Sequence, residues 1–336
     1  MNDYETDVLI IGAGPVGLFS VFELGQLGIK SCIIDSMPDI GGQCTALYPE
    51  KPIYDIPAYP KISAENLIKQ LCKQIEPFQP KIILNTKVQK LKKLNNRFLI
   101  ESSNGEKIFA KCIIIAAGCG AFGPNKPPIP DINEYEEKSV FYSVTDKSKF
   151  EDKTIAIAGG GDSAVDWTIE LSSYAKKIYF IHRRAKLRAA PNNVEILKDL
   201  SKKGKIEMVI PFQLESLNGK QGYIESILLR DFENRPKQIK ADYLIPFYGL
   251  SSDLGPIKDW ELDIFGNSLK INQSSCQTSQ SGIFAIGDIC NYKGKLKLIL
   301  TGFSEAATAA YSCYNLIFPD KVLHFEYSTS KGINKI

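Results

Sequence analysis

Short apolar runs alternate with helical patterns along this chain. The first run, residues 8–11, is too short for a helix and is typical of a buried parallel strand. Apolar residues at helical spacing follow between residues 18 and 24, and a second apolar run, residues 32–34, ends in Asp35. The order strand, helix, strand predicts the opening unit of an α/β fold.

A glycine motif joins the first strand to the first helix. It reads GAGPVG and includes Pro15. Gly12 permits a tight turn, Gly14 lets the backbone approach a pyrophosphate, and Gly17 lets helix and strand pack closely. The helix N-terminus offers free N–H groups to phosphates, and Asp35 can accept hydrogen bonds from an adenosine ribose. The combination indicates a dinucleotide site rather than a plain glycine-rich turn.

The same pattern returns in the middle of the chain. A strand at residues 154–158 precedes GGGDSA, which fits G-x-G-x-x-A, and a helical pattern covers residues 165–174. This predicts a second dinucleotide site. Its expected members in the motif are Gly159, Gly161, Asp162, Ser163 and Ala164.

A basic run follows the next strand, residues 178–181, where an acidic residue would otherwise bind a ribose. It consists of His182, Arg183 and Arg184, with Arg188 shortly after. Guanidinium groups are strong partners for a 2′-phosphate, so the run favours NADP(H) over NAD(H). The alternative is an ordinary solvated basic face.

A third nucleotide signal lies near the end of the chain. The apolar residues 283–286 lead into Gly287 and Asp288, the second signature of FAD sites, whose acid is expected to bind the ribityl chain. A helix over residues 303–316, opened by Thr301 and Gly302, can direct its N-terminus at the flavin ring.

The remaining pattern predicts the domain organisation. Residues 36–60 are proline-rich and read as loop, and Ser63 caps a helix over residues 64–75. Short strands are expected at 82–84, 88–91, 98–101, 107–109, 112–117 and 242–247. The motifs resemble those of the two-dinucleotide flavoproteins, and this resemblance implies two Rossmann-like three-layer ββα domains, with an NADPH-binding domain (118–247) inserted into an FAD-binding domain (1–117 and 248–336).

The composition argues against several other classes of protein. A net charge of +3 does not indicate nucleic-acid binding, and no apolar run reaches the roughly 18–20 residues of a membrane span. The acidic N-terminus does not suit a targeting peptide, so a cytoplasmic location is expected. Two histidines and eight cysteines without C-x-x-C predict no metal site and reduced thiols. Lysine clusters, including residues 293–297, are interpreted as solvated faces, with an acidic protein partner as the alternative.

These motifs together resemble the two-dinucleotide flavoproteins, and the basic run looks most like the thioredoxin reductase branch. The chain departs from that branch at its chemical centre. Residues 141–146, before the second glycine motif, hold no cysteine, and Cys44 after Gly41, Gly42 and Gln43 has no paired cysteine nearby in sequence. A dithiol route for electrons is therefore not expected.

The remaining motifs resemble the ferredoxin–NADP reductases of thioredoxin-reductase-like type over essentially the whole chain. The motifs are the loop with Gln43 and Tyr48 and the C-terminal residues 327–330. The resemblance implies that Tyr48 stacks on one flavin face and that Tyr327 covers the other from the second subunit of a homodimer. It implies FAD contacts at Asp35, Gln43, Tyr48, Val88, Phe122, Asp288 and Thr329. Plain loop packing of Tyr48 and an unstructured tail at Tyr327 stay open.

The implied activity is transfer of electrons between NADPH and ferredoxin: hydride to flavin N5, then single-electron steps, with no catalytic side chain. Flavodoxin, rubredoxin or a quinone are alternative acceptors. A thioredoxin-reductase-like dithiol enzyme, a flavin monooxygenase or NADPH oxidase, and a non-enzymatic nucleotide sensor are the competing classes.

Overall fold

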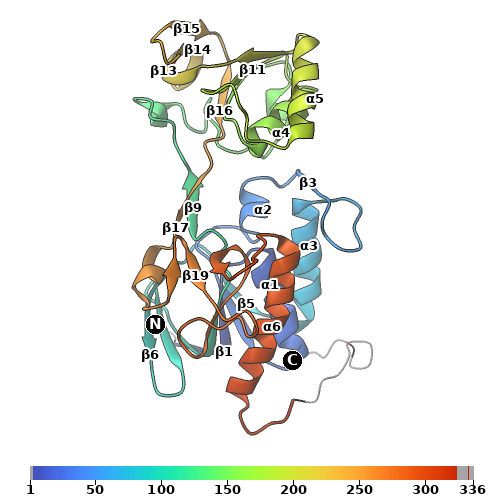
Figure 1. The fold of residues 1–336 in the computed structure, drawn as a ribbon. Coiled ribbons are helices and arrows are strands. Elements are labelled where there is room, and N and C mark those ends of the chain that lie inside the picture. Colours follow the sequence, from blue (N-terminus) through green and yellow to red (C-terminus); the bar gives the residue numbers. More distant parts are fainter. Residues whose placement is uncertain (1–2, 324–331, 333–336) are drawn as a thin grey trace. The chain divides into compact units, whose positions relative to one another are not determined.

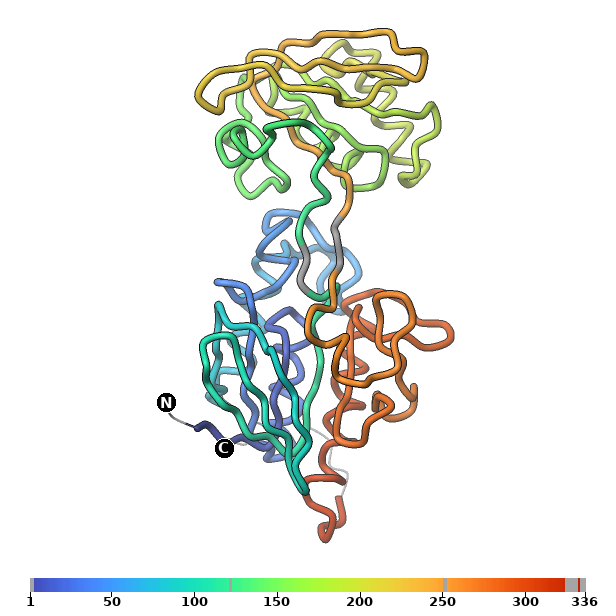
Figure 2. The backbone as a smooth tube through the Cα atoms, turned by 90° about the vertical axis from the view of Figure 1, so that its left-hand side faces the viewer, coloured from blue at the N-terminus to red at the C-terminus, as the bar shows by residue number. Residues whose placement is uncertain are grey.

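The computed structural model describes residues 3–323 and 332, and the chain divides into two compact units. Unit 1 comprises Met1–Phe122 and Ser252–Ile336, and unit 2 comprises Gly123–Ser251. The chain passes between them through two paired strands, β9 (Ala121–Pro124) and β17 (Leu250–Asp253) (Figures 1 and 2). Both crossings lie a few residues beyond the predicted boundaries at 117/118 and 247/248.

A seven-stranded sheet forms the centre of unit 1. Its strand order is β5-β2-β1-β8-β7-β6, with β20 pairing with β8. Strands β5, β2, β1, β8 and β20 are parallel, and β6 and β7 form an antiparallel hairpin at one edge. The bounds are β1 (Tyr4–Ile11), β2 (Ser31–Ile34), β5 (Lys81–Ile83), β6 (Val88–Lys93), β7 (Phe98–Ser102), β8 (Lys107–Ile115) and β20 (Ile283–Ala285).

Strand β8 corrects the prediction of two separate strands at 107–109 and 112–117. It is continuous because its residues from Ile108 to Ile115 pair with β1, while Lys107–Ala110 also pair with β7. The ladder with β1 joins residues far apart in sequence, so local patterning could not reveal the continuity.

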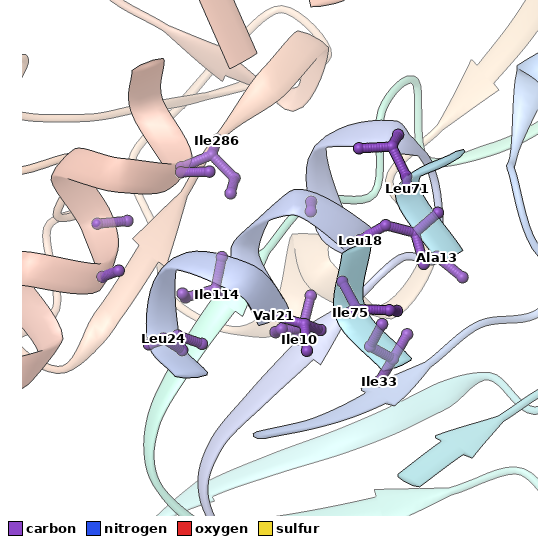
Figure 3. Packing of buried hydrophobic residues seen from close by; sticks show 14 of the residues in the cluster. Ile10, Ala13, Leu18, Val21, Leu24, Ile33, Leu71, Ile75, Ile114 and Ile286 are labelled. Atoms are coloured by element: carbon purple, nitrogen blue, oxygen red, sulfur yellow. The ribbon is translucent and has the colours of Figure 1, made fainter. Parts of the chain in front are cut away.

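Three helices cover one face of this sheet: α1 (Pro15–Gln26), α3 (Ala64–Ile75) and α6 (Ile299–Ile317) (Figure 1). Their apolar faces and the sheet form one buried cluster. Figure 3 shows part of it, including Leu18 and Val21 of α1, Ile75 of α3, and Ile10 and Ile114 of the sheet. The predicted cap of α3 is confirmed, because the Ser63 hydroxyl accepts the backbone N–H of Asn66 at 3.2 Å.

Two predicted segments of unit 1 were wrong in extent. Helix α6 begins at Ile299, before the predicted opening at Thr301 and Gly302, because the chain leaves its extended conformation directly after Leu298. The segment interpreted as loop contains a single-turn helix, α2 (Gln43–Ala46), and a short strand, β3 (Pro52–Ile53). Strand β3 pairs antiparallel with β4 (Ile62–Ser63), which lies just beyond that segment.

The opposite face of the sheet packs against a second apolar cluster, which includes Leu254, Trp260 and Leu269. These side chains come from the segments around η4 (Gly255–Asp259) and a small sheet of β18 (Ile264–Phe265), β19 (Ser268–Lys270) and β21 (Cys290–Asn291). Unit 1 therefore has helices on one side of its parallel sheet and short strands on the other. The turn η1 (Glu76–Phe78) follows α3.

Unit 2 contains a smaller parallel sheet of order β12-β11-β10-β16. Its strands are β10 (Thr154–Ala158), β11 (Lys177–Ile181), β12 (Ile206–Val209) and β16 (Tyr243–Pro246), with helices α4 (Asp162–Leu171) and α5 (Pro191–Lys202). An antiparallel sheet of β13 (Gln213–Lys220), β14 (Tyr223–Arg230) and β15 (Pro236–Ile239) shares a core with it. The turns η2 (Ile132–Glu134) and η3 (Ser148–Phe150) precede β10.

The predicted fold class, two Rossmann-like α/β units with one inserted into the other, is confirmed. The prediction for the helix after β10 was shifted, since α4 begins at Asp162 and ends at Leu171 rather than covering residues 165–174. Within the described part of the chain, no helix combines the length and apolarity that crossing a bilayer requires.

Candidate functional site

The glycine loop of unit 1 contains two packed glycines and one open glycine. A Cβ on Gly12, whose φ is +114°, would lie 2.4 Å from the carbonyl oxygen of Ala116. A Cβ on Gly17 would lie 2.0 Å from the carbonyl oxygen of Gly12. At Gly14 nothing lies within 4 Å of that position. Gly12 and Gly17 therefore bring α1 close to β1, and Gly14 leaves open backbone at the N-terminus of the helix.

Asp35 fastens this loop to the end of the neighbouring strand. One carboxylate oxygen accepts the backbone N–H of Ala13 at 2.6 Å, and the other accepts the N–H of Met37 at 2.8 Å. Each carboxylate oxygen can accept a further hydrogen bond. The anchored side chain therefore still has acceptor capacity towards the space that it lines.

That space is a cavity of about 560 Å³ within unit 1. It runs along the carboxyl ends of the parallel strands, which is where ligands bind in α/β sheets. The residues of the sequence prediction that line it are Gly12, Gly14, Pro15, Asp35, Gln43, Tyr48, Val88, Gly287 and Asp288.

Four predicted residues are not part of the described lining. Gly17 lies beneath the loop, packed on Gly12. Phe122 belongs to β9, but its side chain is not described. Tyr327 and Thr329 lie outside the described residues.

Sequence reasoning missed other parts of the wall. Residues 116–118 follow β8, so their position at the carboxyl end of a predicted buried strand was an available signal. None of the remaining wall residues was named as a candidate site residue. They are residues 11, 16, 34, 36–37, 42, 44, 86–87, 120, 253–257 and 297–299.

The Gly-Asp turn, η5 (Gly287–Ile289), carries an acceptor into the cavity. Gly287 has a φ of +73° and donates its N–H to a carboxylate oxygen of Glu305 at 2.7 Å. The carboxylate of Asp288 is half-buried, lines the cavity and accepts no hydrogen bond from the described part of the chain. It therefore keeps its full acceptor capacity for a ligand.

A buried ion pair lies directly behind this turn. The Lys295 and Glu305 side chains are only 4% and 6% exposed, and Nζ lies 2.5 Å from Oε1. The Tyr292 hydroxyl donates to the same oxygen at 2.7 Å. Burial and the nearby Glu305 carboxylate raise the pKa of the Cys290 thiol to about 12. The interpretation of residues 293–297 as a wholly solvated face was thus wrong for Lys295.

The cysteines near the cavity are single thiols. Cys44 is buried in α2 with its Sγ 3.8 Å from the Tyr48 hydroxyl, and Gln43 Nε2 donates to Cys119 Sγ at 3.4 Å. All eight cysteines of the chain are free in the structure. Burial raises the pKa of both Cys44 and Tyr48, so both are neutral at physiological pH.

The glycine loop of unit 2 repeats this arrangement of packed and open glycines. A Cβ on Gly159 would lie 2.7 Å from the carbonyl oxygen of Phe247 and 2.8 Å from the Ala164 side chain. A Cβ on Gly160 would meet the ring of His182 at 2.2 Å. Nothing lies within 4 Å of that position on Gly161, at the N-terminus of α4. The open backbone is again at the start of the helix.

The basic loop after β11 folds back onto this motif. Arg188 donates its backbone N–H to the carbonyl oxygen of Gly160 at 2.7 Å, and Ala190 donates its N–H to the Asp162 carboxylate at 2.9 Å. The loop therefore brings the predicted arginines to the glycine motif, with Ser163 exposed on the first turn of α4.

The arginines of this loop have no acidic partner among the residues that the structure describes. Arg183, Arg184 and Arg188 are exposed and form no ion pair with any carboxylate of the described residues. Burial, with the three arginines as lesser causes, lowers the pKa of His182, so its ring is neutral near pH 7. The arrangement can bind a doubly charged anion beside an open helix N-terminus.

Comparison with known proteins shows which family the chain belongs to. Residues 6–310 match the family model described as pyridine nucleotide-disulphide oxidoreductase. A protein of Rickettsia conorii named ferredoxin–NADP reductase is 53% identical over 332 residues, which cover 99% of this chain and 98% of the relative. A protein of the same name from Ehrlichia canis is 49% identical over 334 residues, 99% of each chain.

Solved structures show the same fold. The thioredoxin reductase of Lactococcus lactis aligns with a TM-score of 0.79 at 24% identity, covering 94% of this chain and 99% of that one. The thioredoxin reductase of T. acidophilum also aligns at 0.79, with 23% identity and coverage of 93% and 98%.

The chain therefore belongs to the pyridine nucleotide-disulphide oxidoreductase family. Within this family, it belongs with the relatives named ferredoxin–NADP reductase. The resemblance read from the sequence motifs is confirmed.

Proposed function

We propose that this chain is an FAD-dependent oxidoreductase that transfers electrons between NADPH and ferredoxin without a redox-active disulfide. The observation that carries the proposal is the pairing of two sites. One is a cavity lined by both the first glycine motif and Asp288, and the other is an open glycine loop flanked by arginines that form no ion pair with the described residues. The names of the relatives support ferredoxin as the protein partner.

The unit 1 cavity has the donor and acceptor set that FAD requires. Open backbone at Gly14 and the N-terminus of α1 suit a pyrophosphate. Asp35 can accept from the adenosine ribose, and the free carboxylate of Asp288 can accept from ribityl hydroxyls. Tyr48 offers an aromatic face within the same cavity. Gly12, Pro15, Gln43, Val88 and Gly287 complete the proposed contacts in the described lining.

In unit 2, Arg183, Arg184 and Arg188 are the proposed partners of the 2′-phosphate of NADPH. Their guanidinium groups are exposed and carry no ion pair within the described chain, so no internal contact has to break. Gly161 and the first turn of α4 offer free backbone N–H groups to the pyrophosphate. The neutral ring of His182 fills the space over Gly160 and gives the loop its shape.

FAD, when bound, supplies both two-electron and one-electron chemistry. The residues of the chain bind and orient the two nucleotides and exclude water, and no side chain has to move a proton. Cys44, the cysteine in the described cavity lining, faces the Tyr48 hydroxyl, and burial raises its pKa. These facts argue against the dithiol alternative, since a thiolate is the reactive form.

Three further features stay predictions from the sequence. They are the homodimer, the flavin-covering tail with Tyr327 and Thr329, and the cytoplasmic location. The contact of Phe122 with FAD is likewise a prediction from the sequence.

The decisive experiment measures NADPH-dependent electron transfer to purified ferredoxin, with cytochrome c as the final reporter. We expect reduction of cytochrome c to depend on ferredoxin and to slow as salt is raised, because an acidic partner binds lysine-rich surfaces less well under screening. Reduction of a small neutral dye should slow less.

Matched acceptors and a thiol count separate the competing functions. Equal rates with a quinone and no stimulation by ferredoxin would assign another acceptor. The eight cysteines are free in the structure, so the thiol count should stay unchanged on addition of NADPH, and new titratable thiols would indicate a dithiol enzyme.

A further inference from the structure

One carboxylate, that of Glu305, binds both the Gly-Asp turn of the cavity wall and Lys295, which lies two residues before the wall residues 297–299 at the start of α6. Glu305 lies one turn and a half further along α6. Its Oε2 accepts the N–H of Gly287 at 2.7 Å, and its Oε1 accepts Lys295 Nζ at 2.5 Å.

We infer that Lys295 and Glu305 form a positioning pair for FAD, which holds Asp288 and the start of α6 in the relation that the bound flavin requires. The inference rests on the proposed FAD site and names residues that neither glycine motif includes. Lys295 is two residues before Lys297 in the cavity wall, and Gly287 directly precedes Asp288.

The burial of two opposite charges, on Lys295 and Glu305, supports a positioning role. Both side chains are almost completely removed from water, and the desolvation of such a pair commonly cancels its Coulomb attraction. Apolar residues of the same volume often serve stability as well or better. If Lys295 and Glu305 served stability alone, an apolar pair could therefore replace them.

The hydrogen bonds to Glu305 also support a positioning role. A carboxylate binds its N–H and N⁺–H donors through strong, short hydrogen bonds, so it fixes their positions more closely than apolar packing does. Glu305 uses both oxygens: one holds the turn of Gly287, and the other holds Lys295 and the Tyr292 hydroxyl. Loss of one partner should release Asp288 and the residues 297–299 from each other.

The start of helix α1 also packs against the Gly-Asp turn and α6. The Val16 side chain lies 3.6 Å from the position of a Cβ on Gly287 and 2.3 Å from that of a Cβ on Gly302. The starts of α1 and α6 and the Gly-Asp turn are therefore in contact, and a shift at Glu305 reaches the pyrophosphate end of the cavity as well.

The test compares FAD affinity with stability in Glu305→Gln and Lys295→Met. The dissociation constant is measured by titrating FAD into the apo-protein and following flavin fluorescence. Stability of the same apo-protein is measured by urea unfolding. We expect the dissociation constant to rise about tenfold or more, the effect of losing a hydrogen bond to a charged group, and the visible flavin spectrum to shift.

Asp231→Asn is the matched control in unit 2. Asp231 is also a buried carboxylate, which accepts the N–H groups of Glu233 and Arg235 and pairs with the Arg235 guanidinium. The substitution makes the same chemical change away from the cavity. It should lower stability and leave the FAD dissociation constant within about twofold, the scatter of a neutral substitution.

Tyr292→Phe covers the case in which the charge variants do not fold. It removes one hydroxyl from Glu305 and leaves the ion pair in place. We expect a rise of a few-fold in the FAD dissociation constant, since one hydrogen bond to a charged group is lost. An unchanged constant in the folded variants, with only stability reduced, would overturn the positioning role. Wild-type protein that binds FAD but fails to reduce ferredoxin would instead overturn the proposed function alone.

Discussion

The Asp35 carboxylate accepts the backbone N–H of Ala13 at 2.6 Å, so the end of β2 is tied directly to the glycine loop after β1. The same side chain accepts the N–H of Met37 at 2.8 Å. The acid that was expected to recognise a ribose therefore also shapes the loop that faces the pyrophosphate.

Replacing Asp35 tests this double role. Asp35→Ala removes two hydrogen bonds to a charged acceptor, each worth about 1.5–3 kcal/mol at most. We expect the free energy of unfolding of the apo-protein to fall by about 2 kcal/mol or more and FAD affinity to fall with it. Urea unfolding and an FAD titration measure the two effects. Asp39→Ala, an exposed acid four residues later, is the control and should change neither. Identical results for both variants would contradict the prediction.

Gly14→Ala should separate ligand binding from folding. Nothing lies within 4 Å of the new methyl group, and the φ of −70° suits alanine, so stability of the apo-protein should change by no more than about 0.5 kcal/mol. The methyl group would stand where a pyrophosphate approaches the backbone, so FAD affinity should fall at least about tenfold.

Gly17→Ala is the matched comparison for Gly14→Ala. Its methyl group would lie 2.0 Å from the carbonyl oxygen of Gly12, and overpacking of this kind costs about 1–3 kcal/mol. Thermal unfolding of both apo-proteins shows the contrast. Full FAD binding by Gly14→Ala would place the pyrophosphate elsewhere.

Arg183 and Arg184 should decide between NADPH and NADH. Losing both guanidinium groups should cost roughly 2–5 kcal/mol of NADPH binding, since hydrogen bonds between charged groups are worth about 1.5–3 kcal/mol each. Arg183→Ala with Arg184→Ala should raise the Michaelis constant for NADPH far more than that for NADH. Lys202→Ala with Lys203→Ala removes two exposed cations from the same unit and should leave both constants unchanged. An equal rise for both nucleotides would argue for a general basic face.

Removal of the C-terminal tail tests the proposed flavin cover. A chain ending at His324 should keep its FAD, because the nine predicted contacts in the described cavity lining precede that residue. Its flavin spectrum and turnover should change, because one ring face loses an aromatic neighbour; such stacking is worth about 0.5–1.5 kcal/mol beyond the buried area. Tyr327→Phe keeps the ring and serves as the control. Unchanged spectrum, NADPH kinetics and ferredoxin turnover would make Tyr327 an ordinary surface residue.

Much of the site could be predicted because its signals are local. The spacing of Gly12, Gly14 and Gly17 between a strand and a helix, and the strand that ends in Gly287 and Asp288, are each contained in a short stretch of sequence. The capping of α3 by Ser63 is likewise a matter of three residues. Period and turn chemistry decide such features without knowledge of the rest of the fold.

Only the tertiary structure decided that Lys295 is buried. In the sequence it lies among lysines 293 and 297 and reads as solvated, yet it is buried against Glu305 on α6. The continuity of β8 depends in the same way on its pairing with β1. The sequence alone determined where the nucleotide motifs lie, because each is fixed by its own neighbours. Which charges are buried and which strands join depends on contacts between segments distant in sequence, which no local pattern encodes.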